Sequence, residues 1–277
     1  NKNTFNVDDV GYASAAAAGL DGGSLAVTGA SVGTKQGFSI IKFASGSSGN
    51  KTLSHGLLET PTFILVKTTG ASSDWSIYHK DLGGTVNNYL VFGTAANATA
   101  SNIWGAAVPT SSVFGINPGT TCATSQDVIA YLWHDVPGLQ KFGSFEGNDN
   151  ANGTFVELGF KPAIVWVKAI DSAATVGGSA ATSWGMWDSA RMPNNPAGNP
   201  LFANLGTDEN VRGNGSSANT GGSDGNGLDG FLLVDMLSNG FKCRTGAAEI
   251  NDSQTHIYCA WAESPTVNLY GGQSNAR

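Results

Sequence analysis

The sequence repeats itself, and this repeat constrains the fold more than any other feature. The segment PTFILVK (61–67) matches PAIVWVK (162–168), and each has a proline, an apolar run and a lysine at the same spacing. In the same way, IAYLWHDVP (129–137) matches IYCAWAESP (257–265). A self-match of this kind indicates two copies of one structural unit in tandem.

The offsets between matched residues show where the second copy is longer. Lys67 and Lys168 are 101 positions apart (168 − 67), whereas Trp133 and Trp261 are 128 apart (261 − 133). The extra residues lie mainly in a Gly- and Asn-rich insertion near 192–230. Long insertions of this composition are typical of surface loops, which often carry function.

Short β-branched and aromatic runs, separated by Gly, Asn and Ser, predict strands joined by tight turns. The runs of the first copy are FSIIKF, PTFILVK, WSIYH, YLVFG, SVFGI and DVIAYLWH. We expect an all-β chain of two tandem homologous β-sandwich domains. The only helix that we expect is SAAAAGL (14–20), with a turn near DSARMP (188–193).

The repeat also predicts the domain boundaries. Residues 37–138 form the first sandwich, and 139–271 form the second, which contains the insertion. Residues 1–36 belong to neither copy, and we expect an N-terminal arm or linker that packs onto a neighbour, with disorder as the alternative. Within this arm, the apolar and aromatic side chains of Phe5, Val7 and Tyr12 are candidate partner-binding residues. Residues 272–277 form a C-terminal tail.

Composition excludes several functional classes. The net charge is −7 and the 14 Lys and Arg residues are scattered, which argues against a nucleic-acid partner. No apolar run approaches the roughly 20 residues that would cross a bilayer, so we expect no membrane insertion. The three cysteines show no metal-binding spacing and are expected to be buried free thiols.

We expect no enzyme activity, no cofactor and no metal. Glycan hydrolysis needs two carboxylates about 5–10 Å apart. The candidate carboxylates vary or coincide with turns when the copies are compared; they are Asp74, Asp81, Asp135, Glu157, Asp188 and Glu263. Two segments match the G-x-S-x-G pattern, GASVG (29–33) and GGSDG (221–225), but neither is followed by an expected helix, as the nucleophile motif requires. The segment DGNGLDG (224–230) is similar to a calcium loop but lacks the closing Glu, so a solvated loop is favoured.

Two places combine aromatic and polar side chains in the way that sugar-binding sites do. The first follows the strand WSIY and comprises Trp75, Tyr78, His79 and Lys80. The second follows the matching strand WGMW and comprises Trp187, Asp188, Arg191, Asn194 and Asn195. In a regular strand, positions i and i+3 point to opposite faces, so one aromatic of each pair can face a groove or a partner. The alternative is that both rings are buried.

The whole chain resembles a known family. FNVDDVGYASAAAAGL, DWSIYHKDLG and YLWHDVPGLQKFGSFEGN in the first half, with WDSARMPNNP and MLSNGFKCR in the second, are similar to tail-fibre-like virion proteins of tailed phages, especially marine ones. The resemblance implies a location on the exterior of a virion tail or capsid, and no catalytic residues.

From this resemblance we expect a tail-fibre or adhesion-device component that recognises the host surface through its loops. The partners would be other virion proteins and a cell-surface glycan or protein. Family analogy favours a homotrimer. The alternative is an architectural protein, such as a capsid decoration, a knob or a neck appendage, that binds only other virion proteins.

Overall fold

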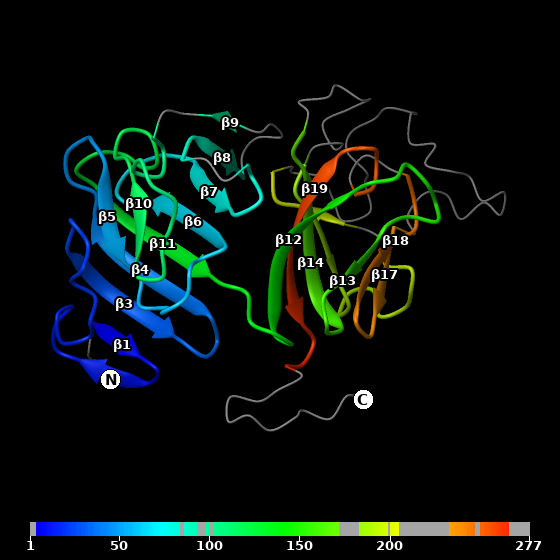
Figure 1. The fold of residues 1–277 in the computed structure, drawn as a ribbon, viewed down its shortest axis with the longest axis horizontal. Helices are drawn as coiled ribbons and strands as arrows, with labels where there is room; N and C mark the ends of the chain where they lie inside the picture. The colour runs from blue at the N-terminus through cyan, green and yellow to red at the C-terminus, as the bar shows by residue number, and fades with distance from the viewer. Residues whose placement is uncertain are drawn as a thin grey trace. The chain divides into compact units, whose positions relative to one another are not determined.

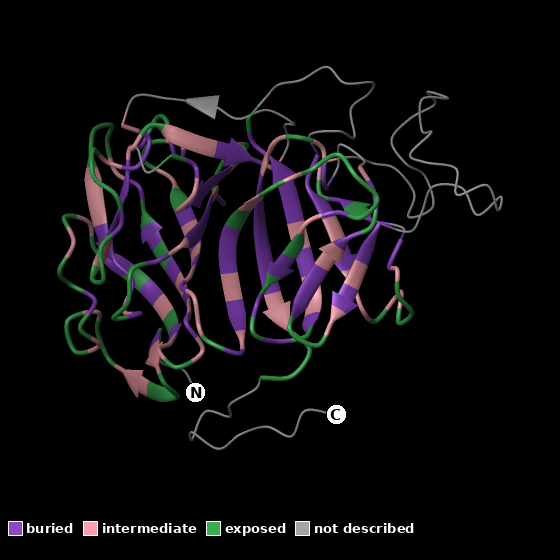
Figure 2. Cartoon of the chain, turned by 45° about the vertical axis from the view of Figure 1, so that its right-hand side comes forward, coloured by how far each residue is buried: buried purple, intermediate pink, exposed green. Residues whose placement is uncertain are grey.

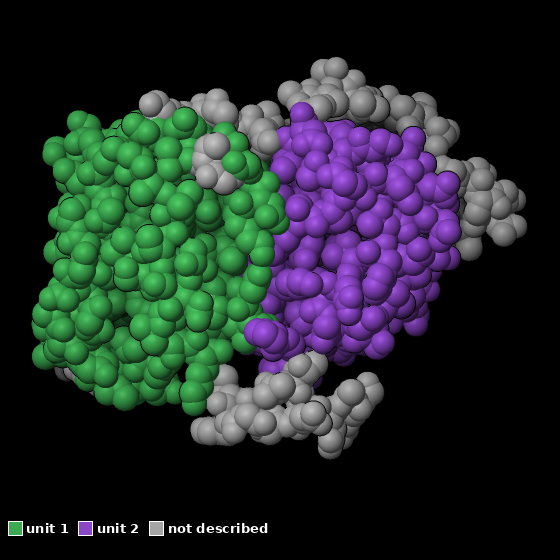
Figure 3. Space-filling view, in the orientation of Figure 1, with its two compact units in different colours: residues 1–91, 98–136 green, residues 92–97, 137–277 purple. Residues whose placement is uncertain are grey.

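The structure is a computed structural model that describes residues 4–83, 86–92, 98–99, 102–171, 183–198, 200–204, 233–246 and 250–265. The regular secondary structure in these ranges consists of β-strands alone, so the all-β prediction is confirmed (Figure 1). The described ranges also hold no helix of the length and apolar character that crossing a membrane requires. The chain divides into two compact units, coloured separately in Figure 3. Unit 1 is Asn1–Val91 with Ala98–Val136, and unit 2 is Phe92–Asn97 with Pro137–Arg277.

Unit 1 contains a large sheet with the strand order β2-β1-β3-β4-β11-β6-β7-β8-β9 and a small sheet of β10 and β5. The strands of unit 1 are β1 (Phe5–Val7), β2 (Val10–Tyr12), β3 (Val27–Gly33), β4 (Phe38–Ala44), β5 (Lys51–Ser54), β6 (Phe63–Thr68), β7 (Trp75–His79), β8 (Asn88–Val91), β9 (Ala98–Thr99), β10 (Val113–Ile116) and β11 (Asp127–Trp133).

Unit 2 contains a large sheet with the order β12-β19-β14-β15-β16 and a small sheet with the order β13-β18-β17. Its strands are β12 (Gln140–Glu146), β13 (Phe155–Glu157), β14 (Pro162–Ala169), β15 (Gly185–Asp188), β16 (Leu201–Phe202), β17 (Val234–Leu237), β18 (Gly240–Cys243) and β19 (Thr255–Ala262).

The strands of the two units correspond in order and register. The run β4-β11-β6-β7-β8 has the same connectivity as β12-β19-β14-β15-β16. The matched residues Trp133 and Trp261 pair with Phe63 and Ile164, which are 101 positions apart (164 − 63). This is the offset of the matched lysines in the sequence. Strands that match in the sequence therefore occupy the same position in the sheet of each unit. That the two copies are homologous stays a prediction from the sequence.

In each unit, a buried apolar cluster contains residues of both sheets. In unit 1, Phe43 and Val128 of the large sheet belong to the same buried cluster as Phe114 of the small sheet. In unit 2, Tyr258 of the large sheet is in a cluster with Phe241 of the small sheet. Buried and less buried residues alternate along β4 and β11, as expected where one face of a sheet is covered, whereas β6 and β7 are buried at consecutive positions (Figure 2).

The N-terminal segment is an integral part of unit 1 and not a separate arm. Strand β3 pairs with β4 along its length, and β1 pairs in parallel with β3. Phe5 is buried in the core, and Val7 and Tyr12 pack against it. Phe5 therefore serves the core of unit 1, whereas partner binding by the half-buried Val7 and Tyr12 stays a prediction.

The helix expected at 14–20 is absent, and this stretch forms successive turns. Its backbone bonds are mixed, since Ala18 N–H donates to Ser14 O at 3.1 Å and Gly19 N–H donates to Ala16 O at 3.1 Å. Gly19 has a φ of 69° and Leu20 is fully buried. A left-handed residue followed by a core anchor ends the segment before a helix can continue.

Candidate functional site

The first predicted site is the end of β7, and its His–Asp pair stabilises a turn. His79 is buried, and its Nδ1 accepts a hydrogen bond from the Asp81 backbone N–H at 3.2 Å. This geometry requires an unprotonated Nδ1, as in a neutral ring. The Asp81 carboxylate is not the group that contacts His79 in this bond. The pair is thus a backbone cap and does not have the carboxylate–imidazole arrangement that acid–base catalysis would use.

The neighbours of His79 also have structural roles. The Tyr78 side chain lies in the core of unit 1, with its ring 5.5 Å from the Trp104 ring in an edge-to-face arrangement. Lys80 Nζ forms an ion pair with Asp135 Oδ2 at 2.8 Å, and both side chains are about one-third exposed, at 36% and 37%. Of the predicted residues here, Lys80 is the one that presents a charged group at the surface.

The second predicted site, at the end of β15, has the same design with different residues. Asp188 Oδ1 accepts hydrogen bonds from the backbone N–H groups of Ala190 at 3.1 Å and Arg191 at 2.8 Å. Arg191 Nε donates to Asp188 Oδ2 at 2.5 Å. Burial raises the pKa of the Asp188 carboxyl, but the hydrogen bonds and charge of Arg191 outweigh it, so the pKa is lowered overall.

His79 and Asp188 occupy equivalent strand ends and accept equivalent hydrogen bonds. Each side chain binds the N–H group two residues further along, at Asp81 and at Ala190. The offset is 109 in both cases (188 − 79 and 190 − 81), the same as between Trp75 and Trp184. The side chain at this position therefore differs between the units, but in both it accepts a backbone hydrogen bond from the turn, because an imidazole nitrogen and a carboxylate oxygen are both acceptors.

The aromatic pairs do not form open platforms. Trp187 lies in the core of unit 2 and is fully buried. Tyr78, at the equivalent position of unit 1, is nearly fully buried. Trp75 lies on the other face of its sheet, half-buried, with its ring 6.1 Å from that of Tyr131. In unit 1 the two rings thus lie on opposite faces, with Trp75 partly exposed, whereas in unit 2 both rings are buried, because Trp184 is also only 1% exposed.

Asn195 covers the edge of a sheet. Its Nδ2 donates to Met236 O at 2.9 Å, and its Oδ1 accepts from Met236 N–H at 2.8 Å. The side-chain amide thus pairs with β17 as a backbone peptide would, next to a β-bridge between Ala197 and Val234. Asn194 is exposed, and no described contact of its side chain is seen. Between these two residues, Asn194 is the one suited to contact a ligand.

Three of the six carboxylates considered for hydrolysis, those of Asp135, Asp188 and Glu263, form ion pairs. Asp135 pairs with Lys80, and Glu263 pairs with Lys161 at 2.6 Å. In the described part of the chain, no group of three or more His, Cys, Asp or Glu side chains could hold a metal ion. The predicted solvated loop at 224–230 and most of the insertion lie outside the described residues.

Comparison with known proteins places the chain in a family. A family model described as a domain of unknown function, DUF7483, matches residues 7–265. The chain belongs to this family. No curated protein and no solved structure matches it.

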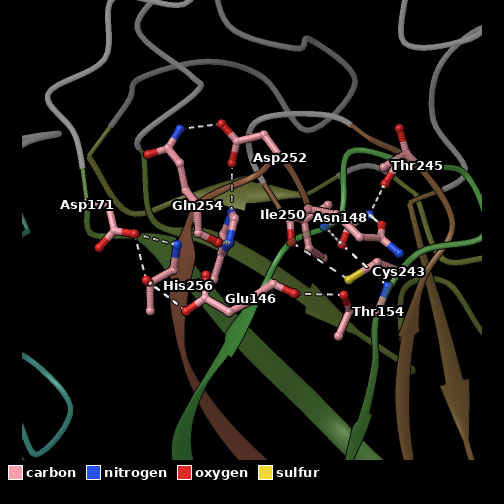
Figure 4. A network of polar contacts seen from close by, with 12 residues as sticks. Glu146, Asn148, Thr154, Asp171, Cys243, Thr245, Ile250, Asp252, Gln254 and His256 are labelled. Carbon is pink, nitrogen blue, oxygen red and sulfur yellow. Dashed lines mark hydrogen bonds and ion pairs between the residues drawn. The ribbon is translucent and has the colours of Figure 1, made fainter.

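The residues matched by the DUF7483 model include a polar network in unit 2, which the sequence does not predict (Figure 4). The Asn251 side chain is buried, and its Nδ2 donates to Thr245 O at 2.8 Å and to Asn148 Oδ1 at 2.8 Å. Nearby, the hydroxyl of Thr255 lies 2.9 Å from Glu146 Oε1 and 2.6 Å from Asp171 Oδ2. Apart from the Asn251–Thr245 bond, these contacts join residues 84 to 109 positions apart, and no local spacing in the sequence indicates them.

The cysteines of this DUF7483 chain are free and buried, as predicted. Burial raises the pKa of Cys122 and of Cys243 to about 12. A thiol that stays protonated at neutral pH is a poor nucleophile and a poor metal ligand. These cysteines therefore act as small core residues.

Proposed function

We propose that this protein is a non-enzymatic component of a tailed-phage particle, a tail-fibre or adhesion-device component that recognises the host surface. The recognition surface would be the pair of turns that follow β7 and β15. The resemblance of the sequence to tail-fibre-like virion proteins supports the phage context.

The equivalence of His79 and Asp188 is the observation that carries the proposal. Each holds its turn in place with the same backbone hydrogen bond. The side chains around the two caps differ, with Lys80 in unit 1 and Arg191 in unit 2. A fixed scaffold that displays different polar groups is typical of binding surfaces, whereas a catalytic pair would be retained for its chemistry.

The test is binding of the purified protein to a glycan array and to bacterial cells. We expect binding to weaken in a Lys80→Ala/Asn194→Ala double variant, because Lys80 is a partly exposed charged group of the first turn and Asn194 is an exposed amide of the second. Lys42→Ala is the matched control, since Lys42 is an exposed lysine on β4 away from the turns. Unchanged binding in the double variant would refute the role of the turns.

The location of the protein in the particle separates this proposal from the architectural alternative. Turns that point outward from a tail or capsid would support recognition, and turns covered by other virion proteins would support an architectural role. The predicted homotrimer is checked by light scattering on the purified protein.

A further inference from the structure

The two units differ at one edge of their sheets. In unit 1, β4 lies between β3 and β11, whereas the equivalent β12 pairs with β19 alone among the described strands. The small sheets differ in the same place. The edge of β5 is covered by residues 24–25, while the equivalent β13 pairs with β18 alone among the described strands.

In unit 1, one extended segment covers both edges. This segment is SLAVTGA (24–30). Leu25 N–H donates to Thr52 O at 3.0 Å, and Thr52 N–H donates to Ser24 Oγ at 2.8 Å. Two residues after Leu25, the segment joins the large sheet, where Val27 pairs with Phe43. It therefore runs from the small sheet to the large one and closes this side of unit 1.

Burial at equivalent positions shows what the missing segment leaves uncovered in unit 2. Phe43 is fully buried, whereas its equivalent Phe145 is only half-buried. These two are equivalent because they pair with Val128 and His256, at matched positions of β11 and β19. At the position of Thr52, unit 2 has Phe155, which is 42% exposed on an edge strand.

Side chains of unit 2 bridge this open side without adding a strand. Thr154 Oγ1 donates to Glu146 O at 2.7 Å, which Figure 4 shows, and Lys141 Nζ donates to Glu157 O at 2.8 Å. Between these bridges, Ser144 is exposed and the Phe155 ring is partly exposed. An exposed aromatic residue on an edge strand is a feature that invites pairing with another chain.

We propose that this edge of unit 2, formed by Ser144–Glu146 of β12 and Phe155–Glu157 of β13, binds an extended segment of a partner polypeptide by strand addition. The covering segment of unit 1 defines the chemistry of the occupant. In the covering segment, two aliphatic residues, Leu25 and Val27, are two positions apart and are followed by small residues that let the backbones approach. We expect the same pattern in the occupant.

The occupant is a different polypeptide and not the N-terminal segment of a second copy. That segment is already committed in unit 1, where Leu20 is fully buried and Val27 is 4% exposed. Its release would expose both to water. The inference does not rest on the proposed function, because it concerns a different surface from the turns after β7 and β15.

The test uses a fluorescent synthetic peptide, SLAVTGA, titrated with the purified protein and followed by fluorescence anisotropy. We expect saturable binding, and we expect hydrogen exchange to slow at residues 143–146 and 155–157. Ser144→Pro removes a backbone donor at the edge, and Phe155→Glu removes the apolar contact, so each is expected to weaken binding about tenfold. Phe155→Glu changes an exposed side chain and keeps the test usable if Ser144→Pro fails to fold.

Val10→Glu is the matched control, because Val10 is an apolar residue on the edge strand β2 and is 52% exposed. This variant is expected to bind the peptide normally. Absence of peptide binding to the wild-type protein would overturn the proposal, as would an equal loss in Val10→Glu. Self-association that Phe155→Glu abolishes, without peptide binding, would also overturn it and would indicate pairing between copies.

Discussion

Lys168 Nζ lies 6.0 Å from the centre of the Trp184 ring, and Lys67 Nζ lies at the same distance from the Trp75 ring. The sequence repeat matches the two lysines with each other and the two tryptophans with each other. The pairs differ in burial, since Lys168 is fully buried and Lys67 is half-buried with its Nζ donating to Ser73 O. The same cation–π geometry therefore occurs in two different solvent environments.

Lys168 is expected to destabilise the folded protein at neutral pH. Burial lowers its pKa from 10.5 to about 8, so between about pH 8 and 10.5 the unfolded chain binds more protons and stability rises with pH. We expect Lys168→Met to raise the free energy of unfolding by about 1–3 kcal/mol near pH 7, with the gain falling from about pH 8 and vanishing above about pH 10.5. Denaturant titrations across this range measure the difference. The control Lys67→Met removes a partly solvated charge, and an equal gain there would contradict the explanation.

His55 is expected to make the protein acid-sensitive. Its Nδ1 accepts from Leu57 N–H at 3.2 Å, and burial lowers its pKa from 6.5 to about 4. The unfolded chain therefore binds a proton first, and stability falls by up to about 3 kcal/mol as the pH drops from about 6.5 to 4. His55→Gln, which can still donate and accept, should remove this part of the pH dependence. A thermal-melting series at several pH values would reveal an unchanged slope if the explanation is incorrect.

The caps at the ends of β7 and β15 need an acceptor and not a particular acid or base. We expect His79→Ala to be less stable than His79→Asn by about 1 kcal/mol, because only Asn can still accept the Asp81 N–H. The same comparison at Asp188, with Ala and Asn, should give the same order. Chemical denaturation of the four variants checks this. Equal stability of the Ala and Asn variants at both positions would count against the caps.

Asn195 is expected to matter for stability, whereas its neighbour Asn194 is not. Asn195→Ala removes two hydrogen bonds and leaves the Met236 N–H and C=O without these partners, at a cost of about 1–3 kcal/mol. Asn194→Ala, at an exposed position, should change stability by less than about 0.5 kcal/mol. The difference in unfolding midpoint between the two variants decides the matter.

The sequence predicted six strands of the first copy, because each is a short apolar run bounded by turn residues, but it missed β5 and β9, which are not apolar runs. WSIYH and SVFGI coincide with β7 and β10 to within one residue. It failed for β3, VTGASVG, whose small residues show little apolar alternation. The pairing of β3 with β4 depends on a hairpin and on the core beneath it, which are tertiary features that composition does not report.

The sequence predicted where the candidate sites lie, but not what each of their side chains does. The two turns follow equivalent strands, as the repeat indicated, and Lys80 and Asn194 are partly or fully exposed there. Trp187 and Asn195 have structural roles that depend on partners far away in the sequence, such as Met236. Residue type and spacing cannot distinguish a buried ring or a sheet-edge amide from a ligand contact.

The position of β11 and β19 has a consequence for how the chain is made. Each is the last described strand of its unit in sequence, yet each lies between earlier strands, β11 between β4 and β6 and β19 between β12 and β14. During synthesis, each large sheet therefore remains in two separate halves until its last strand leaves the ribosome. Each unit can then close only in a late step through long-range pairing, which is slow compared with local folding and exposes unpaired edges to other chains in the meantime.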